Sequence, residues 1–111
     1  MREFTFKEIV EELVQLIGPT LTALSSGAVE HSTVEAWLNG LEPEVSQEER
    51  LRFALEVLSD VAELNGNDVA RAWFIGASCQ NFTTAPFEAI RTGYFNSVRN
   101  SARRFINDDF S

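Results

Sequence analysis

Apolar residues recur every three or four positions along almost the whole chain, which is the spacing of one face of an α-helix. The clearest stripes run through residues 6–17 and, over a longer stretch, through residues 51–62. No segment alternates apolar and polar residues between hairpin turns, as a half-buried strand would. The pattern therefore predicts an all-α fold.

Local signals predict where each helix begins and ends. Three capping-box patterns, Thr5-x-x-Glu8, Ser32-x-x-Glu35 and Ser46-x-x-Glu49, are typical of helix starts, and a proline at the first position favours a start at Pro19 and at Pro86. Glycines that follow apolar runs are typical of helix ends. Together these signals predict helices over residues 5–17, 19–26, 32–38, 46–65, 68–76, 86–93 and 95–107.

The predicted helices fall into three parts. Residues 1–43 read as a helix-turn-helix-like head, because a short helix, a tight turn and a second short helix follow one another. Residues 44–66 form the long connecting helix, and residues 67–111 form a small C-terminal helical module. A chain of 111 residues has the size of one folded unit.

The charge of the chain limits the kinds of molecule that it can bind. With 17 acidic against 9 basic side chains the formal net charge is -8, which repels nucleic-acid phosphates and anionic membranes. The single cysteine excludes an internal disulfide, and no signal peptide or membrane-spanning apolar run is evident. We therefore expect a cytoplasmic protein without a membrane partner.

Catalytic and metal-binding patterns are weak. His31 is the sole histidine, and Cys79 has no histidine in its own half of the chain to act as a base. Clustered metal ligands and phosphate-binding glycine loops are not found in the sequence. We expect neither an enzyme nor a bound cofactor or metal.

The head resembles the Xre or Cro type of repressor through Leu24, Ser32-Thr33-Val34, Trp37-Leu38-Asn39-Gly40 and Pro43. In that family the second helix of the pair reads the major groove, so the resemblance implies DNA contacts from Ser32, Thr33 and Asn39. Residues 1–43, however, carry Arg2 and Lys7 against seven acids, whereas phosphate anchoring needs several cations. A purely structural head is the alternative.

The C-terminal half is similar to the toxin-binding domain of the Xre/MbcA/ParS group of bacterial antitoxins. The similarity runs through Ala72-Trp73, Pro86, Glu88-Ala89-Ile90, Gly93, Val98, Ala102 and Phe105. It implies an antitoxin that binds and inhibits a RES-domain, NAD-consuming toxin, with a head that can bind the operon's own promoter. Two departures are Ala85, where a capping Thr or Ser is common, and a reading helix without cations.

Side-chain chemistry also favours the C-terminal module as a binding surface. It carries eight of the twelve aromatic residues, and aromatic and arginine side chains are the usual anchors of protein interfaces. We predict toxin contacts from the arginines of the last helix and from the tail, namely Arg99, Arg103, Arg104, Asp108, Asp109 and Phe110. The alternatives are a DNA-binding regulator of the Xre type, and a dimeric adaptor whose homodimer covers the arginines.

Overall fold

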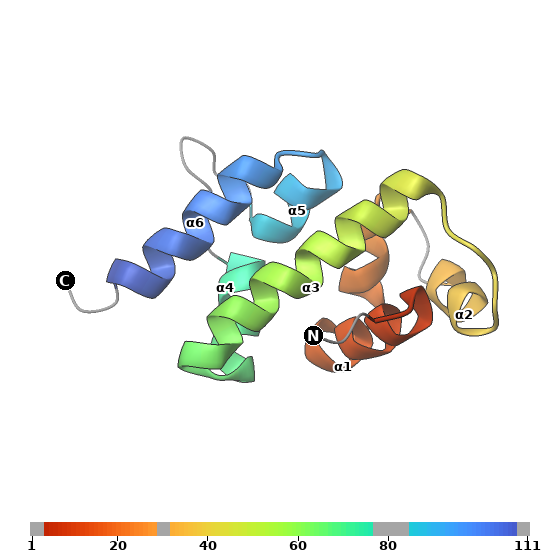
Figure 1. The fold of residues 1–111 in the computed structure, drawn as a ribbon, viewed down its shortest axis with the longest axis horizontal. Helices are drawn as coiled ribbons and strands as arrows, with labels where there is room; N and C mark the ends of the chain where they lie inside the picture. The colour runs from red at the N-terminus through yellow and green to blue at the C-terminus, as the bar shows by residue number, and fades with distance from the viewer. Residues whose placement is uncertain (1–3, 29–31, 77–84, 109–111) are drawn as a thin grey trace.

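The computed structural model describes residues 4–28, 32–76 and 85–108 of the chain. Within these ranges the fold is all-helical and contains no strand, which confirms the predicted class. The six helices, drawn in Figure 1, are α1 (Phe6–Ser26), α2 (Ser32–Leu38), α3 (Val45–Asn65), α4 (Asn67–Gly76), α5 (Pro86–Arg91) and α6 (Phe95–Asp108).

Helix α1 combines two predicted helices across a kink. At its start the Thr5 hydroxyl accepts a hydrogen bond from the backbone of Glu8 at 3.2 Å, and the Glu8 carboxylate accepts one from the backbone of Thr5 at 2.9 Å. At Gly18 the backbone leaves helical geometry with φ 89° and ψ 164°, and Pro19 begins the second part. Gly27, with φ 97°, ends the helix in the left-handed region that glycine adopts at little cost.

Helix α3 begins earlier than the sequence signal indicates. The capping box predicted at Ser46 is wrong, because the helix already starts at Val45 and the side chain of Gln47 accepts a hydrogen bond from the backbone of Glu44 at 2.9 Å. A second capping pattern therefore lies two residues upstream of the predicted one. The predicted end is confirmed, since Gly66 follows Asn65 with φ 92°.

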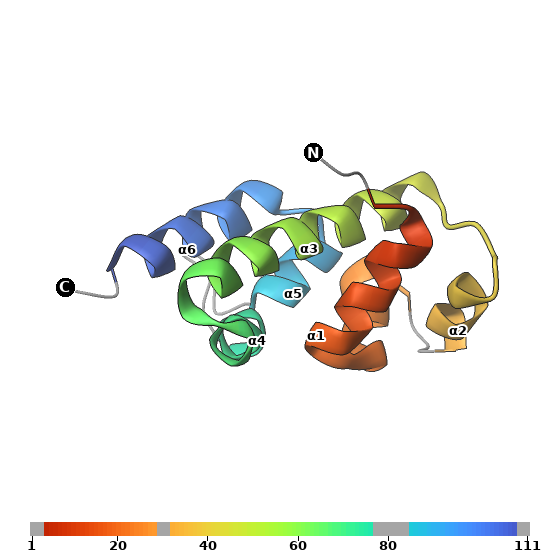
Figure 2. The same ribbon diagram turned by 60° about the horizontal axis from the view of Figure 1, so that its bottom comes forward.

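One continuous core joins the helices around α3, which contacts α1, α4, α5 and α6 (Figures 1 and 2). The largest fully buried side chains come from α1, α2, α3, α4, α5 and α6 alike and include Ile9, Leu13, Trp37, Leu51, Leu58, Phe74, Ile90 and Val98. The predicted boundaries at residues 43 and 66 stay predictions.

Helices α4, α5 and α6 pack around two aromatic residues of α4. Trp73 and Phe74 are buried, with Phe105 of α6 at 6.5 Å from the Trp73 ring and Phe87 of α5 at 6.4 Å from the Phe74 ring. The indole Nε1–H of Trp73 is buried without a hydrogen-bond partner among the described residues. Within the same residues, no helix is both long and apolar enough to span a bilayer.

Candidate protein-binding surface

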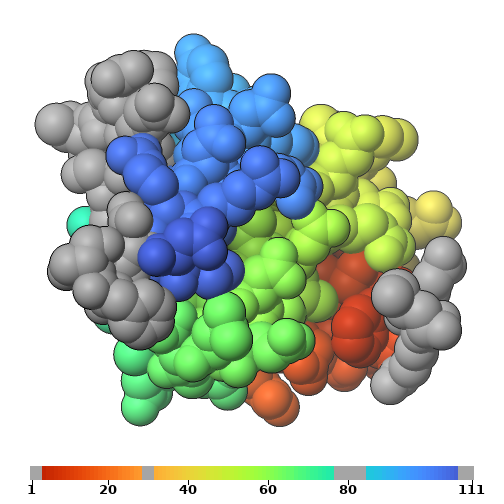
Figure 3. Space-filling model, turned by 60° about the vertical axis from the view of Figure 1, so that its left-hand side comes forward, coloured from red at the N-terminus to blue at the C-terminus, as the bar shows by residue number. Residues whose placement is uncertain are grey.

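Helix α6 has one face in the core and one in solvent. Val98 and Ala102 are buried and Phe105 is half-buried, which follows from their spacing of three and four residues. Arg103 and Arg104 fall on the opposite side and are exposed. Figure 3 shows the last turns of α6 on the surface beside α3. The face that packs and the face that carries charge are thus set by the same periodicity.

Arg99 is held in place by α3. Its Nη2 lies 2.9 Å from the Glu56 Oε1, and its guanidinium carbon lies 5.0 Å from the centre of the Phe53 ring. Phe53 in turn stacks on Phe95, with ring centres 4.6 Å apart and planes 12° from parallel. An ion pair and a cation–π contact therefore fix one of the three predicted arginines against the protein itself.

The other two arginines are differently placed. Neither Arg103 nor Arg104 forms an ion pair or hydrogen bond with another residue in the described part of the chain. The helices α3 and α6 run in the same direction, as the pairs Phe53–Phe95 and Glu56–Arg99 require (Figures 1 and 2). Arg103 therefore comes one turn after the fixed Arg99, where a guanidinium remains available to another molecule.

A hollow of about 370 Å³ lies between α3 and α6, which we call the α6-side hollow. It is lined by the stacked pair Phe53 and Phe95 and by four charged residues, Arg52, Arg99, Glu49 and Glu56. Arg52 is itself paired, with its Nη2 2.7 Å from the Glu48 Oε2. The hollow thus combines an aromatic pair with two positive and two negative side chains.

Acidic residues gather further along the exposed side of α3. Burial, and then the negative charges of Glu56 and Glu63, raise the pKa of the Asp60 carboxyl, while Arg99 lowers it. The ionised form of Asp60 is therefore disfavoured by its surroundings. This part of the surface has an excess of negative charge that Arg99 does not neutralise.

The three predicted arginines lie on one helix, and part of the predicted surface lies outside the described residues. Arg99, Arg103 and Arg104 share one helix, and Asp108 is the last residue of that helix. Asp109 and Phe110 lie outside the described residues. Tyr94, which precedes α6, is 56% exposed and lies at the other end of the same helix.

The residues predicted to contact DNA lie on and just after α2. Ser32 and Asn39 are exposed and Thr33 is half-buried. The helix reads Ser-Thr-Val-Glu-Ala-Trp-Leu and has no cation, while its Glu35 is exposed. Phosphate anchoring would have to come from elsewhere on the surface.

Two arginines outside the predicted site, one on α5 and one on α3, contact the end of α1. The Arg91 Nη1 of α5 donates to the backbone oxygens of Leu24 at 3.0 Å and Ala28 at 2.9 Å. The Arg50 Nη1 of α3 donates to the backbone oxygen of Ser26 at 3.3 Å. Positive charge favours the carbonyl end of a helix, so both arginines stabilise the end of α1, which has no basic residue in its own last turn.

Other chemistry has no support in the described part of the chain. No group of three or more His, Cys, Asp or Glu side chains there could hold a metal ion. His31 and Cys79 lie outside the described residues. Comparisons of the chain with family models, curated proteins and solved structures found no match.

Proposed function

We propose that this chain is an antitoxin-like protein that binds and inhibits a partner toxin through its C-terminal helices and tail. The observation that carries the proposal is the exposed pair Arg103 and Arg104 on α6, without an ion-pair partner among the described residues of a chain whose net charge is -8. A cationic surface on an acidic protein is suited to an acidic patch of one partner. The same surface serves poorly for nucleic acid, because the rest of the molecule repels phosphate.

The packing of α6 supports a binding role. The helix that carries Arg103 and Arg104 is packed against the core through Val98 and Ala102, and Arg99 contacts Glu56 and Phe53 of α3. The backbone of this helix therefore needs no ordering when a partner binds, which reduces the entropic cost of association. Arginine is also among the residues that contribute most at the centres of interfaces.

The type of partner follows from the resemblance to the Xre/MbcA/ParS antitoxins and not from the geometry. That resemblance names a RES-domain, NAD-consuming toxin, whose substrate entrance the last helices and the tail would cover. The acidic residues of the tail, Asp108 and Asp109, and the aromatic Phe110 belong to the same proposed contact. A cytoplasmic location and a homodimer also belong to the proposal.

Co-expression with the product of the adjacent gene tests the proposal. We expect the two proteins to elute together in size-exclusion chromatography and the toxin's NAD consumption to fall when this chain is added. Separate elution, with unchanged NAD consumption, would reject the antitoxin role.

A second proposal is sequence-specific DNA binding by the head, favoured by the exposure of Ser32 and Asn39 at the two ends of α2. It predicts a mobility shift with the chain's own upstream DNA at low salt, weakened by Asn39→Ala. Because the head is acidic, the complex should dissociate at modest salt. No shift at low salt would reject this role.

A further inference from the structure

Helices α3 and α6 present exposed faces of opposite charge side by side. The two helices contact one another, and Figure 3 shows both on one side of the molecule. In its second half α3 exposes three acids, Glu56, Asp60 and Glu63, and has no cation. Before its last residue α6 has no acid, and it exposes Arg103 and Arg104. An acidic strip on α3 therefore lies beside a basic strip on α6.

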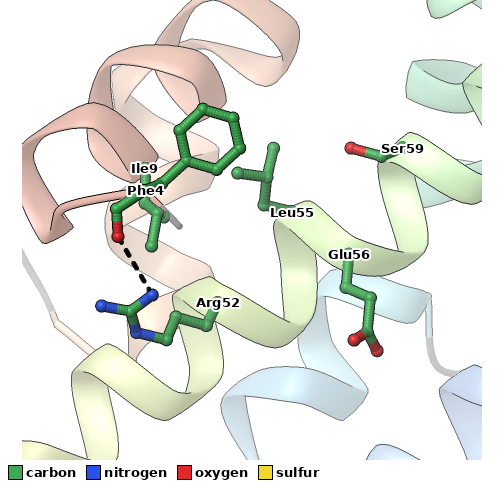
Figure 4. Close-up of a pocket in the computed structure, with 6 residues that line it drawn as sticks. All are labelled: Phe4, Ile9, Arg52, Leu55, Glu56 and Ser59. Atoms are coloured by element: carbon green, nitrogen blue, oxygen red, sulfur yellow. Dashed lines mark hydrogen bonds between the residues drawn. The ribbon is translucent and has the colours of Figure 1, made fainter. Parts of the chain in front are cut away.

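The acids of α3 lie on the side of that helix that borders α6. The Glu56 Oε1 is 2.9 Å from the Arg99 Nη2 of α6. In Figure 4 the side chain of Leu55 points towards Phe4, which precedes α1, and Glu56 points away from it. Asp60 follows Glu56 by four residues, so it lies on the same face of α3, one turn later.

The register of the two helices places Asp60 and Arg103 at one level. The helices run in the same direction, and the ion pair between Glu56 and Arg99 fixes their register. One turn further along each helix come Asp60 and Arg103. Neither forms an ion pair or hydrogen bond with the other or with another described residue. Two opposite charges thus remain available, side by side, to another molecule.

This arrangement of charges is complementary to itself. A two-fold axis that runs between α3 and α6, parallel to both, places α6 of a second copy over α3 and α3 of the second copy over α6. Residues at one level stay at that level under this rotation, so Asp60 of each copy faces Arg103 of the other. Leu64, which is 66% exposed, comes one turn after Asp60 and faces the last turn of α6, where Ile106 is half-buried.

We propose that the exposed faces of α3 and α6 bind the same faces of a second copy of this chain, with Asp60 of each copy against Arg103 of the other. A partner that covered both strips with one sign of charge would be repelled by one of them. A second copy brings both signs in the matching order, and the favourable contact forms twice.

The size of this interface predicts a weak dimer. Helix α6 has 14 residues and is therefore about 21 Å long, and two helices side by side are about 20 Å wide. Each copy thus contributes roughly 400 Å². Stable complexes bury about 1,200–2,000 Å² in total, so we expect a reversible dimer with a dissociation constant in the micromolar range or above.

The interface specifies the homodimer of the proposed function, and it does not require the toxin. Arg103 belongs to both contacts, so a toxin bound there displaces the second copy; this competition alone rests on the proposed function. Self-association is measured on the chain by itself, whereas toxin binding is measured on the complex. A dimer without toxin binding rejects the antitoxin role alone, and toxin binding without a dimer rejects this interface alone.

Sedimentation equilibrium of the full chain over a range of concentrations tests the interface. We expect Arg103→Glu and Asp60→Arg each to weaken self-association at least about tenfold, because each variant places like charges opposite one another twice. Arg71→Glu is the matched control for a charge reversal, since Arg71 is exposed on α4, outside the interface, and it should stay within about threefold of the parent chain. Circular dichroism checks that each variant keeps its helices.

Mixing the two single variants separates a contact between copies from an effect within one copy. In the mixed dimer one contact keeps Asp60 against Arg103, and the other joins the two substituted side chains, again of opposite charge. The mixture should therefore dimerise within about threefold of the parent chain, although neither variant does so alone. A parent chain that stays monomeric up to about 1 mM, single variants that associate like Arg71→Glu, or a mixture that stays monomeric would each overturn the proposal.

Discussion

The link between Arg91 and the end of α1 gives the most specific stability prediction. Arg91→Met keeps most of the apolar stem but removes the guanidinium that donates to the backbone oxygens of Leu24 and Ala28. The Leu24 oxygen keeps a hydrogen bond from the backbone of Gly27 at 3.1 Å, whereas the Ala28 oxygen loses the bond from Arg91. The main destabilising effect of the substitution is therefore the loss of the hydrogen bond to the backbone oxygen of Ala28.

The expected loss in the free energy of unfolding follows from these hydrogen bonds. A hydrogen bond from a charged donor is worth about 1.5–3 kcal/mol, and leaving a buried carbonyl unpaired costs a similar amount. Because Arg91 is half-buried and one of its two acceptors keeps a partner, we expect Arg91→Met to lower the free energy of unfolding by about 2–3 kcal/mol. Arg103→Met is the matched control and should change it by no more than about 0.5 kcal/mol, because Arg103 is exposed and unpaired among the described residues.

Urea unfolding followed by circular dichroism measures both variants. The Arg91→Met midpoint should fall by about 1 M or more, while the Arg103→Met midpoint stays close to that of the parent protein. Equal midpoints for the two variants would contradict the reasoning, because the helix end would then be stable without its guanidinium.

Three further predictions concern charge, a buried indole and a glycine. Asp60→Asn should raise the free energy of unfolding at neutral pH by a few tenths of a kcal/mol. The pKa of Asp60 is raised in the folded protein, so the stability that its protonated form contributes is complete below the unfolded pKa and is lost as the pH rises through the folded pKa. The urea midpoints of the variant and the parent protein should therefore converge in acid. Trp73→Phe should cost less than about 1.5 kcal/mol in the same assay, against about 3–5 kcal/mol for Trp73→Ala, because the indole N–H that it removes is buried and unpaired among the described residues. Gly27→Ala should lower the thermal midpoint, since a Cβ there would lie 3.0 Å from the Arg50 Nη1 and φ is 97°. Gly76→Ala is the control and should not lower the midpoint, because its Cβ would meet open space and its φ is not positive. Equal midpoints for the two variants would contradict this explanation.

Short-range signals in the sequence predicted most of the helix ends. The ends at Gly27 and Gly66 were predicted from the glycine, and both glycines have positive φ. Gly18 was predicted to end one helix before a second begins at Pro19, and in the structure it is a kink within α1, also with positive φ. The start of α3 was not predicted correctly, because two capping patterns lie two residues apart and the hydrogen bond forms at Glu44 instead of at Ser46. Competition between neighbouring caps depends on how the chain approaches the helix, which the local pattern does not contain.

The contacts at the candidate surface join residues far apart in the sequence, so they could not be predicted from local patterns. The position of Arg99 on α6 could be read from the helical period, but its pairing with Glu56 joins residues 43 positions apart. The hydrogen bonds from Arg91 to α1 join residues 67 and 63 positions apart. No pattern in a single sequence indicates such pairs, so the α6-side hollow and the arginines at the end of α1 emerge only from the packed helices.

The most direct test of the central claim, that the exposed arginines of α6 hold a partner toxin, is the dissociation constant of the complex with the adjacent gene's product. We expect the double variant Arg103→Glu, Arg104→Glu to weaken binding at least about a hundredfold, since each close charge reversal at an interface costs more than a tenfold loss. Arg71→Glu, at an exposed position of α4, should leave the affinity within about threefold of the parent protein. Equal affinities for the double variant and for Arg71→Glu would contradict the claim.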